Sequence, residues 1–530
     1  MRSRTLTAVQ SAWEMLGDFF NESDPQKSSS LFTSPNHASA AIMLDDSTSW
    51  VIHPLYVKGE WKGQGRQGLL NQVHYDANGK PIADYPVNKS FTAPKLPSSG
   101  IPWMVPHSDF FTSSVLYPEW SFLGYTSAVK YSLTDRPGWL RLSPKNSLQA
   151  NTVIKNDGEH NYSLITRLDF NAQSTSDQAG LWIMRGDQTM EVKLVSTFST
   201  KGLKLITFSF KDTKYETGNT IGDTLWLKLV RINHKISGYF SGDGFDWVEI
   251  GSPIDISDID SFSDFSTFTG TRQGLYVRGT SDAWFDFYIY RDAYTPIMAE
   301  CPANQFGTAL VVTKLPPNLL GKIHNDDWAL YAGIEFGNAE YAKSCDSLKI
   351  TASCLTAGSS VEVYIDSIDV DTKIAVCAID TTGSLTNFRT FTTDLLKPVS
   401  GNHDIYLKFV GPGSGELFRL ESFQFITNSK PTAINSRQGN NLPQRFYLEQ
   451  NYPNPFNPVT RIKYSVPKTG YITIKVYDLM GREVATIFEG VQQVGNYTAI
   501  LDGSNLTSGI YFYRMEANGF TETKKLVFLK

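Results

Sequence analysis

The chain has 530 residues, of which 41 % are hydrophobic, 19 % charged and 13 % aromatic, and its formal net charge is −5. This composition is that of a globular protein, and the length predicts about three to five domains of roughly 150 residues each. The weak negative charge gives no argument for nucleic-acid binding, and no run of about 18 apolar residues is present, so no transmembrane segment is expected.

The first 20 residues, MRSRTLTAVQSAWEMLGDFF, have no continuous apolar stretch, so no signal peptide is predicted in this chain. Two patterned runs follow, SPNHASAAIMLDDSTSWVIHPL and GQGRQGLLNQVHYDANGKPIADYPV. Residues 1–90 resemble the last blade of the five-bladed β-propellers of glycoside hydrolase family 43, with a histidine at His37, a strand bearing Trp50, and a Gly-Arg pair that ends at Arg66. The resemblance implies that His37 points into the central channel near a metal or water and that Arg66 braces the blade. A surface histidine and an ordinary salt-bridging arginine are the alternative.

Hydrolysis by family 43 enzymes depends on three acids, which the resemblance places on the first three blades. An inverting reaction needs an acid and a base about 6.5–9.5 Å apart. Glu14 does not match the family's acid, so the sequence identifies no catalytic residue and predicts a propeller remnant that lacks the catalytic carboxylates.

Residues 91–102, FTAPKLPSSGIP, read as a linker, and residues 103–292 follow as a unit of alternating runs with Gly- and Asp-rich turns. Such a pattern predicts a two-sheet β-sandwich. The unit resembles the concanavalin-A-like domain attached to family 43 β-xylosidases and arabinofuranosidases. Its tryptophans are expected in the core or between the sheets, because most fall on alternating strands: Trp120, Trp139, Trp182, Trp226 and Trp247.

Residues 297–427 give a further sandwich, which is similar to family 6 carbohydrate-binding modules in the Asp327-Trp328 pair and in the Asp404-Ile405-Tyr406-Leu407 run. The resemblance implies a jelly-roll fold and matches Glu300 to a residue that often holds a structural calcium ion through hard oxygen ligands. A plain edge-strand acid is the alternative for Glu300.

The usual sugar cleft of such modules carries a Tyr, a Trp and an Asn, because aromatic rings stack on the apolar face of a sugar. Here the corresponding positions are Lys322, Leu385 and Arg419, so binding through this cleft is in doubt, although a second face could still bind. Three nearby aromatic residues are predicted to belong to the core: Phe388, Tyr331 and Trp328.

Four cysteines fall in this part of the chain: Cys301, Cys345, Cys354 and Cys377. They are too few for a disulfide scaffold, and no CxxC spacing indicates zinc. One or two disulfides are compatible with an oxidising compartment, with no pairing favoured by the sequence.

Residues 428–445 form a polar linker, and residues 446–530 alternate with period two between turns such as Met480-Gly481 and Ser508-Gly509. This predicts a small immunoglobulin-like sandwich. The motifs NYPNPFNP, MGREV, SGIYFYR and KKLVFLK resemble the type A C-terminal sorting domain of the type IX secretion system. The resemblance implies transport to the outer-membrane surface or the medium, with the secretion machinery as a partner. An export address without an entry signal suggests that Met1 is not the natural start.

The expected architecture is all-β: a propeller remnant followed by three β-sandwich domains. Two functions are compatible with it. One is a secreted, hemicellulose-degrading glycoside hydrolase acting on xylan or arabinoxylan, represented by a part without the catalytic acids. The other is a non-catalytic, surface-displayed protein that binds carbohydrate.

Overall fold

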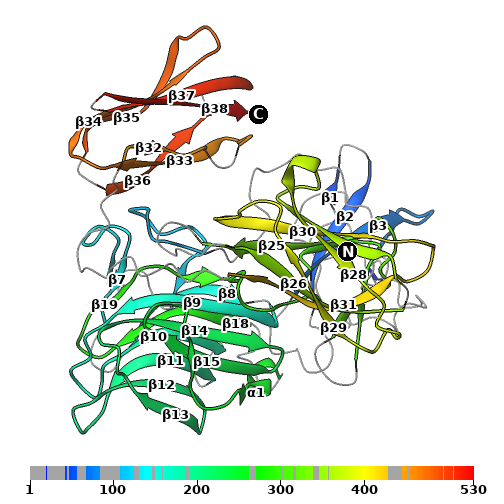
Figure 1. Ribbon diagram of the computed structural model, residues 1–530, viewed down its shortest axis with the longest axis horizontal. Helices are drawn as coiled ribbons and strands as arrows, with labels where there is room; N and C mark the ends of the chain where they lie inside the picture. The colour runs from blue at the N-terminus through cyan, green and yellow to red at the C-terminus, as the bar shows by residue number, and fades with distance from the viewer. Residues whose placement is uncertain are drawn as a thin grey trace, which may run out of the picture. The chain divides into compact units, whose positions relative to one another are not determined.

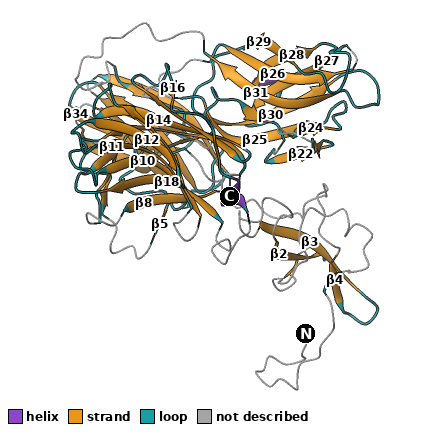
Figure 2. Ribbon diagram, turned by 90° about the horizontal axis from the view of Figure 1, so that it is seen from below, coloured by secondary structure: helices purple, strands orange, loops and turns teal. Residues whose placement is uncertain are grey.

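The computed structural model describes residues 19–20, 42–44, 47–55, 67–83, 108–123, 130–145, 150–157, 159–185, 190–261, 270–300, 302–313, 318–337, 345–355, 357–427, 445–451, 454–492, 495–504, 506–517 and 519–529. Strands dominate these residues, and the helical elements described are the single turns α1, Ser257–Asp260, and η6, Val370–Thr372 (Figure 2). The prediction of an all-β protein is therefore confirmed. The chain forms two compact units, one of residues 1–95, 104–110 and 116–431, the other of residues 96–103, 111–115 and 432–530.

The first described part of the larger unit is one antiparallel sheet in the order β1-β2-β3-β4. Its strands are β1 Ile42–Met43, β2 Ser49–Leu55, β3 Gln67–Tyr75 and β4 Pro81–Ala83. A small core of Phe20, Val51, Val73 and Ala83 packs against it. Four antiparallel strands are the size of one propeller blade. His37, Arg66 and Glu14 lie outside the described residues.

The predicted concanavalin-A-like unit is a sandwich of two large antiparallel sheets (Figure 1). The first has the order β13-β12-β11-β10-β18-β8-β5, with β5 Ser121–Phe122, β8 Asn151–Asp157, β10 Gln178–Arg185, β11 Glu191–Phe198, β12 Lys204–Phe210, β13 Thr213–Gly218 and β18 Thr271–Arg278. The second has the order β16-β15-β14-β9-β19-β7-β6, with β17 paired to β15 and β20 to β9. Its strands are β6 Tyr131–Ser132, β7 Leu140–Leu142, β9 Asn161–Asp169, β14 Thr224–Ile232, β15 Lys235–Ser241, β16 Val248–Glu249, β17 Ile254–Asp255, β19 Ala283–Phe285 and β20 Ile289–Tyr290.

Alternation decides which side chains enter this core, as in Leu225, Leu227 and Leu229 of β14, which are fully buried. The prediction for the tryptophans is confirmed for the four that are buried: Trp120, Trp139, Trp182 and Trp226. Trp247 is half-buried and lies beneath the Lys228 ammonium group.

The third part of this unit, the predicted binding module, is a jelly-roll-like sandwich of a six-stranded and a five-stranded sheet. The six-stranded sheet contains β21 Ile297–Met298, β23 Ala309–Val311, β24 Leu319–Gly321, β26 Ser347–Cys354, β29 Arg389–Asp394 and β31 Phe418–Ile426. The five-stranded sheet has the order β22-β25-β30-β27-β28, with β22 Asn304–Phe306, β25 Trp328–Glu335, β27 Ser359–Ile365, β28 Lys373–Ile379 and β30 Asn402–Val410. Cys345, Cys354 and Cys377 are buried free thiols, and Cys301 lies outside the described range.

The smaller unit carries the predicted sorting domain, a sandwich of a three-stranded and a four-stranded sheet. The first sheet has the order β32-β33-β36, with β32 Tyr447–Leu448, β33 Val459–Val466 and β36 Gly495–Asp502. The second has the order β35-β34-β37-β38, with β34 Gly470–Tyr477, β35 Glu483–Gln492, β37 Gly509–Ala517 and β38 Phe520–Phe528. The period-two residues Ile462, Tyr464 and Val466 point into its core, as the sequence predicts.

Candidate functional site

The predicted cleft of the binding module also contains the carboxylate of Glu416, which the sequence analysis did not single out. Lys322 is exposed at the end of β24, and its backbone N–H donates to Oε1 of Glu416 at 2.9 Å. The Arg419 guanidinium donates to the same oxygen through Nε at 3.0 Å. Burial alone would raise the pKa of Glu416, but the hydrogen bonds from Arg419 and Lys322 hold that pKa below its ordinary value.

Leu385 reaches the same end of the module from the turn between β28 and β29. Its carbonyl oxygen accepts a hydrogen bond from Ser353 Oγ at 2.8 Å, and Ser353 pairs with Arg419 across β26 and β31. The structure therefore places Lys322, Leu385 and Arg419 at the same end of the module, and their role in binding sugar stays a prediction. Where related modules stack aromatic rings on a sugar, this chain has an ion pair and a half-buried leucine.

A second candidate surface is the outer face of the five-stranded sheet. Trp328 on β25 and Tyr406 on β30 are both half-buried, and their ring centroids lie 5.9 Å apart at an interplanar angle of 56°. Trp328 pairs with Lys408 and Tyr406 pairs with Tyr364 on β27, so one face carries all four side chains. Neighbouring aromatic rings that are partly open to solvent can stack on the apolar face of a sugar.

Polar groups border these rings. Glu362 accepts hydrogen bonds from the Tyr364 hydroxyl at 2.5 Å and from Lys373 Nζ at 2.6 Å. Burial alone would raise the pKa of Glu362, but the hydrogen bonds from Lys373 and Tyr364 lower it. The pKa of Lys408 is raised mainly by its hydrogen bond to Asp326, at 2.9 Å. The surface thus offers fixed charges beside two rings, a combination suited to binding sugar hydroxyls.

The core prediction is confirmed for Tyr331, which is buried, but it is wrong for Trp328 and Phe388, which are half-buried and outside the hydrophobic core of the module. The signal that could have found the outer face was the alternation in the run from Asp404 to Phe409. Ile405, Leu407 and Phe409 are fully buried, so Tyr406 must share a face with Asp404 and Lys408.

Glu300, the proposed calcium ligand, is 4 % exposed. Its Oε1 accepts a hydrogen bond from the Asn161 side chain on β9. Oδ1 of Asn161 in turn accepts a hydrogen bond from the backbone N–H of Asn233 at 2.9 Å. Burial raises the pKa of Glu300, and hydrogen bonds from Asn161 and Asn318 oppose that shift. In the described part of the chain no three His, Cys, Asp or Glu side chains come close enough to share a metal ion. The surroundings shown for Glu300 are amides rather than acids, so calcium there stays a prediction, which equilibrium dialysis against calcium can test.

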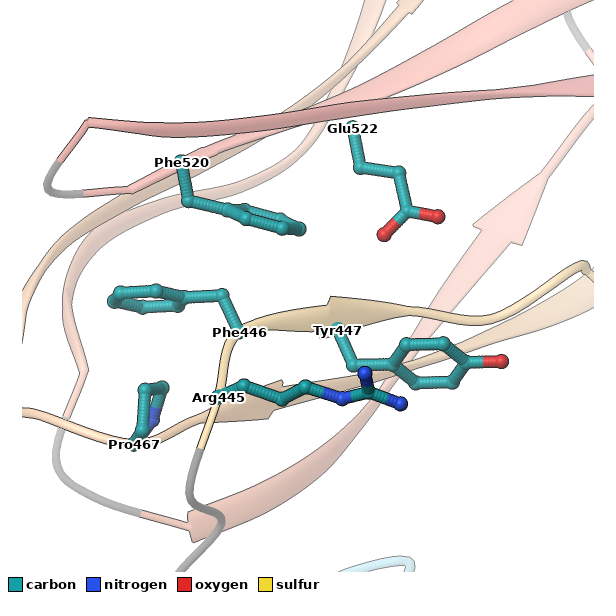
Figure 3. Close-up of a pocket in the computed structure, with 6 residues that line it drawn as sticks. All are labelled: Arg445, Phe446, Tyr447, Pro467, Phe520 and Glu522. Atoms are coloured by element: carbon teal, nitrogen blue, oxygen red, sulfur yellow. The ribbon is translucent and has the colours of Figure 1, made fainter.

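In the sorting domain, two motifs that are far apart in the sequence meet. Phe456, from the NYPNPFNP motif, forms a parallel bridge with Phe528 near the end of the chain, and their rings lie 4.9 Å apart. At the other end of β38, Phe446 and Phe520 stack with ring centroids 5.5 Å apart and line an open pocket together with Arg445, Tyr447, Pro467 and Glu522 (Figure 3).

Three family models match the chain. The β-xylosidase C-terminal concanavalin A-like domain matches residues 108–291, the family 6 carbohydrate-binding module matches 299–427, and the secretion system C-terminal sorting domain matches 450–529. The chain is thus a protein of the type IX secretion route, directed to the cell surface or the extracellular space, with a carbohydrate-binding module. Among the described residues, no helix has the length and apolar character needed to span a membrane.

The homologues of the chain are family 43 arabinofuranosidases and xylosidases. An arabinoxylan arabinofuranohydrolase of Paenibacillus polymyxa is 29 % identical over 154 residues, which is 28 % of this chain and 23 % of the relative. A non-reducing end α-L-arabinofuranosidase of Bacteroides ovatus is 26 % identical over 273 residues, 46 % of this chain and 50 % of the relative. A family 43 glycoside hydrolase structure from Bacillus licheniformis has 22 % identity and a TM-score of 0.44, over 51 % of this chain and 55 % of that one. The chain spans half or less of the length of these two curated relatives.

Proposed function

We propose that the chain belongs to a secreted protein that degrades hemicellulose and acts on arabinoxylan side chains, xylan or xylo-oligosaccharides. In this proposal the outer face of the five-stranded sheet holds the polysaccharide. The observation that carries it is the half-exposed pair Trp328 and Tyr406, bordered by Glu362 and Lys408. The printed activity of the Paenibacillus relative, on arabinoxylan, supports this choice of polymer.

The two candidate faces differ in the surface that they offer to a sugar ring. A pyranose ring loses water from its apolar face when it stacks on an aromatic ring, and an ion pair offers no equivalent surface. Arg419 is engaged by Glu416 at the cleft, whereas the ring centroids of Trp328 and Tyr406 lie 5.9 Å apart on the outer sheet face. Sugar hydroxyls can reach Glu362 and Lys373 from the same face.

A second candidate function is a surface-displayed protein that binds polysaccharide without cleaving it. One observation favours it. Glu362 and Asp326, the carboxylates beside the aromatic pair, are engaged with Lys373 and Lys408. The lowered pKa of Glu362 keeps that carboxyl ionised, so it is unsuited to act as a general acid.

The test uses the full chain and soluble arabinoxylan in affinity electrophoresis and titration calorimetry. Trp328→Ala and Tyr406→Ala should each weaken binding by roughly three- to tenfold, because each removes one stacking ring. Phe388→Ala is the matched control, since it removes a half-buried ring in the segment that carries Leu385. Binding that is lost in Phe388→Ala but retained in Trp328→Ala and Tyr406→Ala would contradict the proposal.

The nucleotide sequence upstream of the Met1 codon separates the two functions, because the hydrolase proposed here has its catalytic carboxylates outside this chain. An in-frame continuation that encodes the propeller acids favours the hydrolase, and a stop codon with a promoter favours the surface-displayed binding protein. Turnover of aryl arabinofuranosides, aryl xylosides or arabinoxylan by the purified chain would contradict the prediction that the catalytic carboxylates are missing from it.

A further inference from the structure

In the sorting domain, residues from the start of the domain contact the outer edge of its last strand, β38. Val527 donates its backbone N–H to Asn454 Oδ1 at 2.7 Å, and its carbonyl accepts from the Phe456 backbone at 3.0 Å. Leu529 donates to the Phe456 carbonyl at 3.1 Å. Lys525 offers its carbonyl to the side chains of Gln450, at 2.6 Å, and Asn454, at 3.3 Å. Gln450, Asn454 and Phe456 therefore contact the edge of β38 that faces away from β37.

The same flanking segment continues along the strand. Leu448 donates its backbone N–H to Glu522 Oε2 at 3.2 Å, and Phe446 stacks on Phe520 beside the pocket in Figure 3. Contacts from Phe446, Leu448, Gln450, Asn454 and Phe456 thus follow β38 from its first residue to its last. The two ends of the domain form one structure, although about 70 residues separate them in the sequence.

Two apolar side chains near the end of the chain are unavailable to a partner, whereas Leu529 is 51 % exposed. Leu526 and Phe528 are fully buried, and Phe528 packs on Phe456. A Cβ atom at Gly503 would lie 2.9 Å from the Phe456 ring and 3.0 Å from the Phe528 ring, so this contact is closely packed. A protein that recognises the folded terminus would meet its exposed residues and the residues that cover its backbone edge, not the buried side chains of Leu526 and Phe528.

An uncovered strand edge is a template for pairing with another chain. We propose that Gln450, Asn454 and Phe456 act as a latch that closes the edge of β38, and that the export address is the latched surface rather than the linear terminus. This rests on the sorting function of the domain. The terminal residues act here by completing the sandwich and holding the latch.

The repeated Asn-Pro sequence supplies a matched pair of variants. Asn454 and Asn457 both precede a proline, but only Asn454 is seen to contact β38 within the described residues. In the full chain, preceded by a cleavable signal peptide for the display experiment, Asn454→Ala should increase amide exchange at Val527 by about tenfold, as expected for loss of one hydrogen bond. It should also lower surface display in a bacterium with the type IX machinery. Asn457→Ala should match the unaltered chain in both measurements.

Gln450→Ala is a milder variant, which removes one hydrogen bond to the Lys525 carbonyl. It allows the same two measurements if Asn454→Ala fails to fold. Faster amide exchange at Val527 with normal surface display would overturn the proposal. Equal loss of display in Asn457→Ala and Asn454→Ala would also overturn it, because that result is expected if the machinery recognises the linear sequence. If the unaltered chain is not displayed at all, the sorting function itself fails. The exchange comparison then still tests whether the latch exists.

Discussion

The binding module has two faces that could meet a sugar, and they differ in kind. The cleft end holds Lys322 and Arg419 at the carboxylate of Glu416, with Leu385 hydrogen-bonded to Ser353 nearby. The outer sheet face holds Trp328 and Tyr406 beside ion pairs. The comparison teaches that a module can keep its fold while the aromatic rings suited to stacking on a sugar lie on another face.

The largest effect should come from returning aromatic rings to the cleft. Lys322→Tyr combined with Leu385→Trp should raise affinity for xylo-oligosaccharides, because each ring adds roughly 0.5–1.5 kcal/mol of stacking. The pair of changes should act equally in a Trp328→Ala background, since the two faces are separate. Titration calorimetry measures both. An unchanged affinity would show that Glu416 and Arg419 keep the cleft closed to sugar.

The next effect concerns the stability of the cleft. Glu416→Ala should lower the free energy of unfolding by about 1–2 kcal/mol, because Arg419 and the Lys322 amide lose a partly buried, charged acceptor. The pKa of Glu416 is depressed in the folded protein, so its contribution is present above the unfolded pKa of about 4.3 and is lost as the pH falls. Denaturant unfolding at pH 7 and at acidic pH measures this. An equal destabilisation at both pH values would contradict the assignment.

A smaller effect is expected on the outer face. Glu362→Gln keeps the shape of the side chain but removes the charge that holds Lys373 and Tyr364, and should cost about 0.5–1 kcal/mol of stability. It should also weaken sugar binding by a few-fold if Glu362 orients hydroxyl groups. Lys349→Gln, on the opposite sheet, is the control. Weaker binding in the control would point to a general loss of charge rather than to this face.

The smallest effect concerns His403, at the start of β30. Burial would lower its pKa, but Asp366, at 2.8 Å from Nδ1, raises it above the ordinary value. Because the pKa of His403 is raised in the folded protein, the stabilisation from its pairing with Asp366 is complete below the unfolded pKa of about 6.5. This stabilisation is lost as the pH rises through the folded pKa. His403→Gln should therefore remove a modest stabilisation, about 0.5 kcal/mol, that is seen at pH 5 and absent at pH 9. Unfolding curves at both values check this.

The sequence could predict the layers of this protein because alternation and turn residues are local signals. Ile405, Leu407 and Phe409 identify a half-buried strand without any knowledge of its neighbours. It could also place Lys322, Leu385 and Arg419 at one cleft, because the family pattern carries that spacing. Glu416 could not be found in this way, since its role arises only when the loop before β31 folds against the end of β24. Trp328 was misassigned because an aromatic residue beside buried neighbours resembles a core residue until the strand register is known.

The most direct test of the account is hydroxyl-radical footprinting of the full chain with and without a saturating arabinoxylo-oligosaccharide. The method reports solvent access to individual side chains, so it compares the two faces in one experiment. The account predicts slower oxidation of Trp328 and Tyr406 in the presence of the sugar and an unchanged rate at Leu385. Protection of Leu385 with unchanged oxidation of Trp328 and Tyr406 would contradict it.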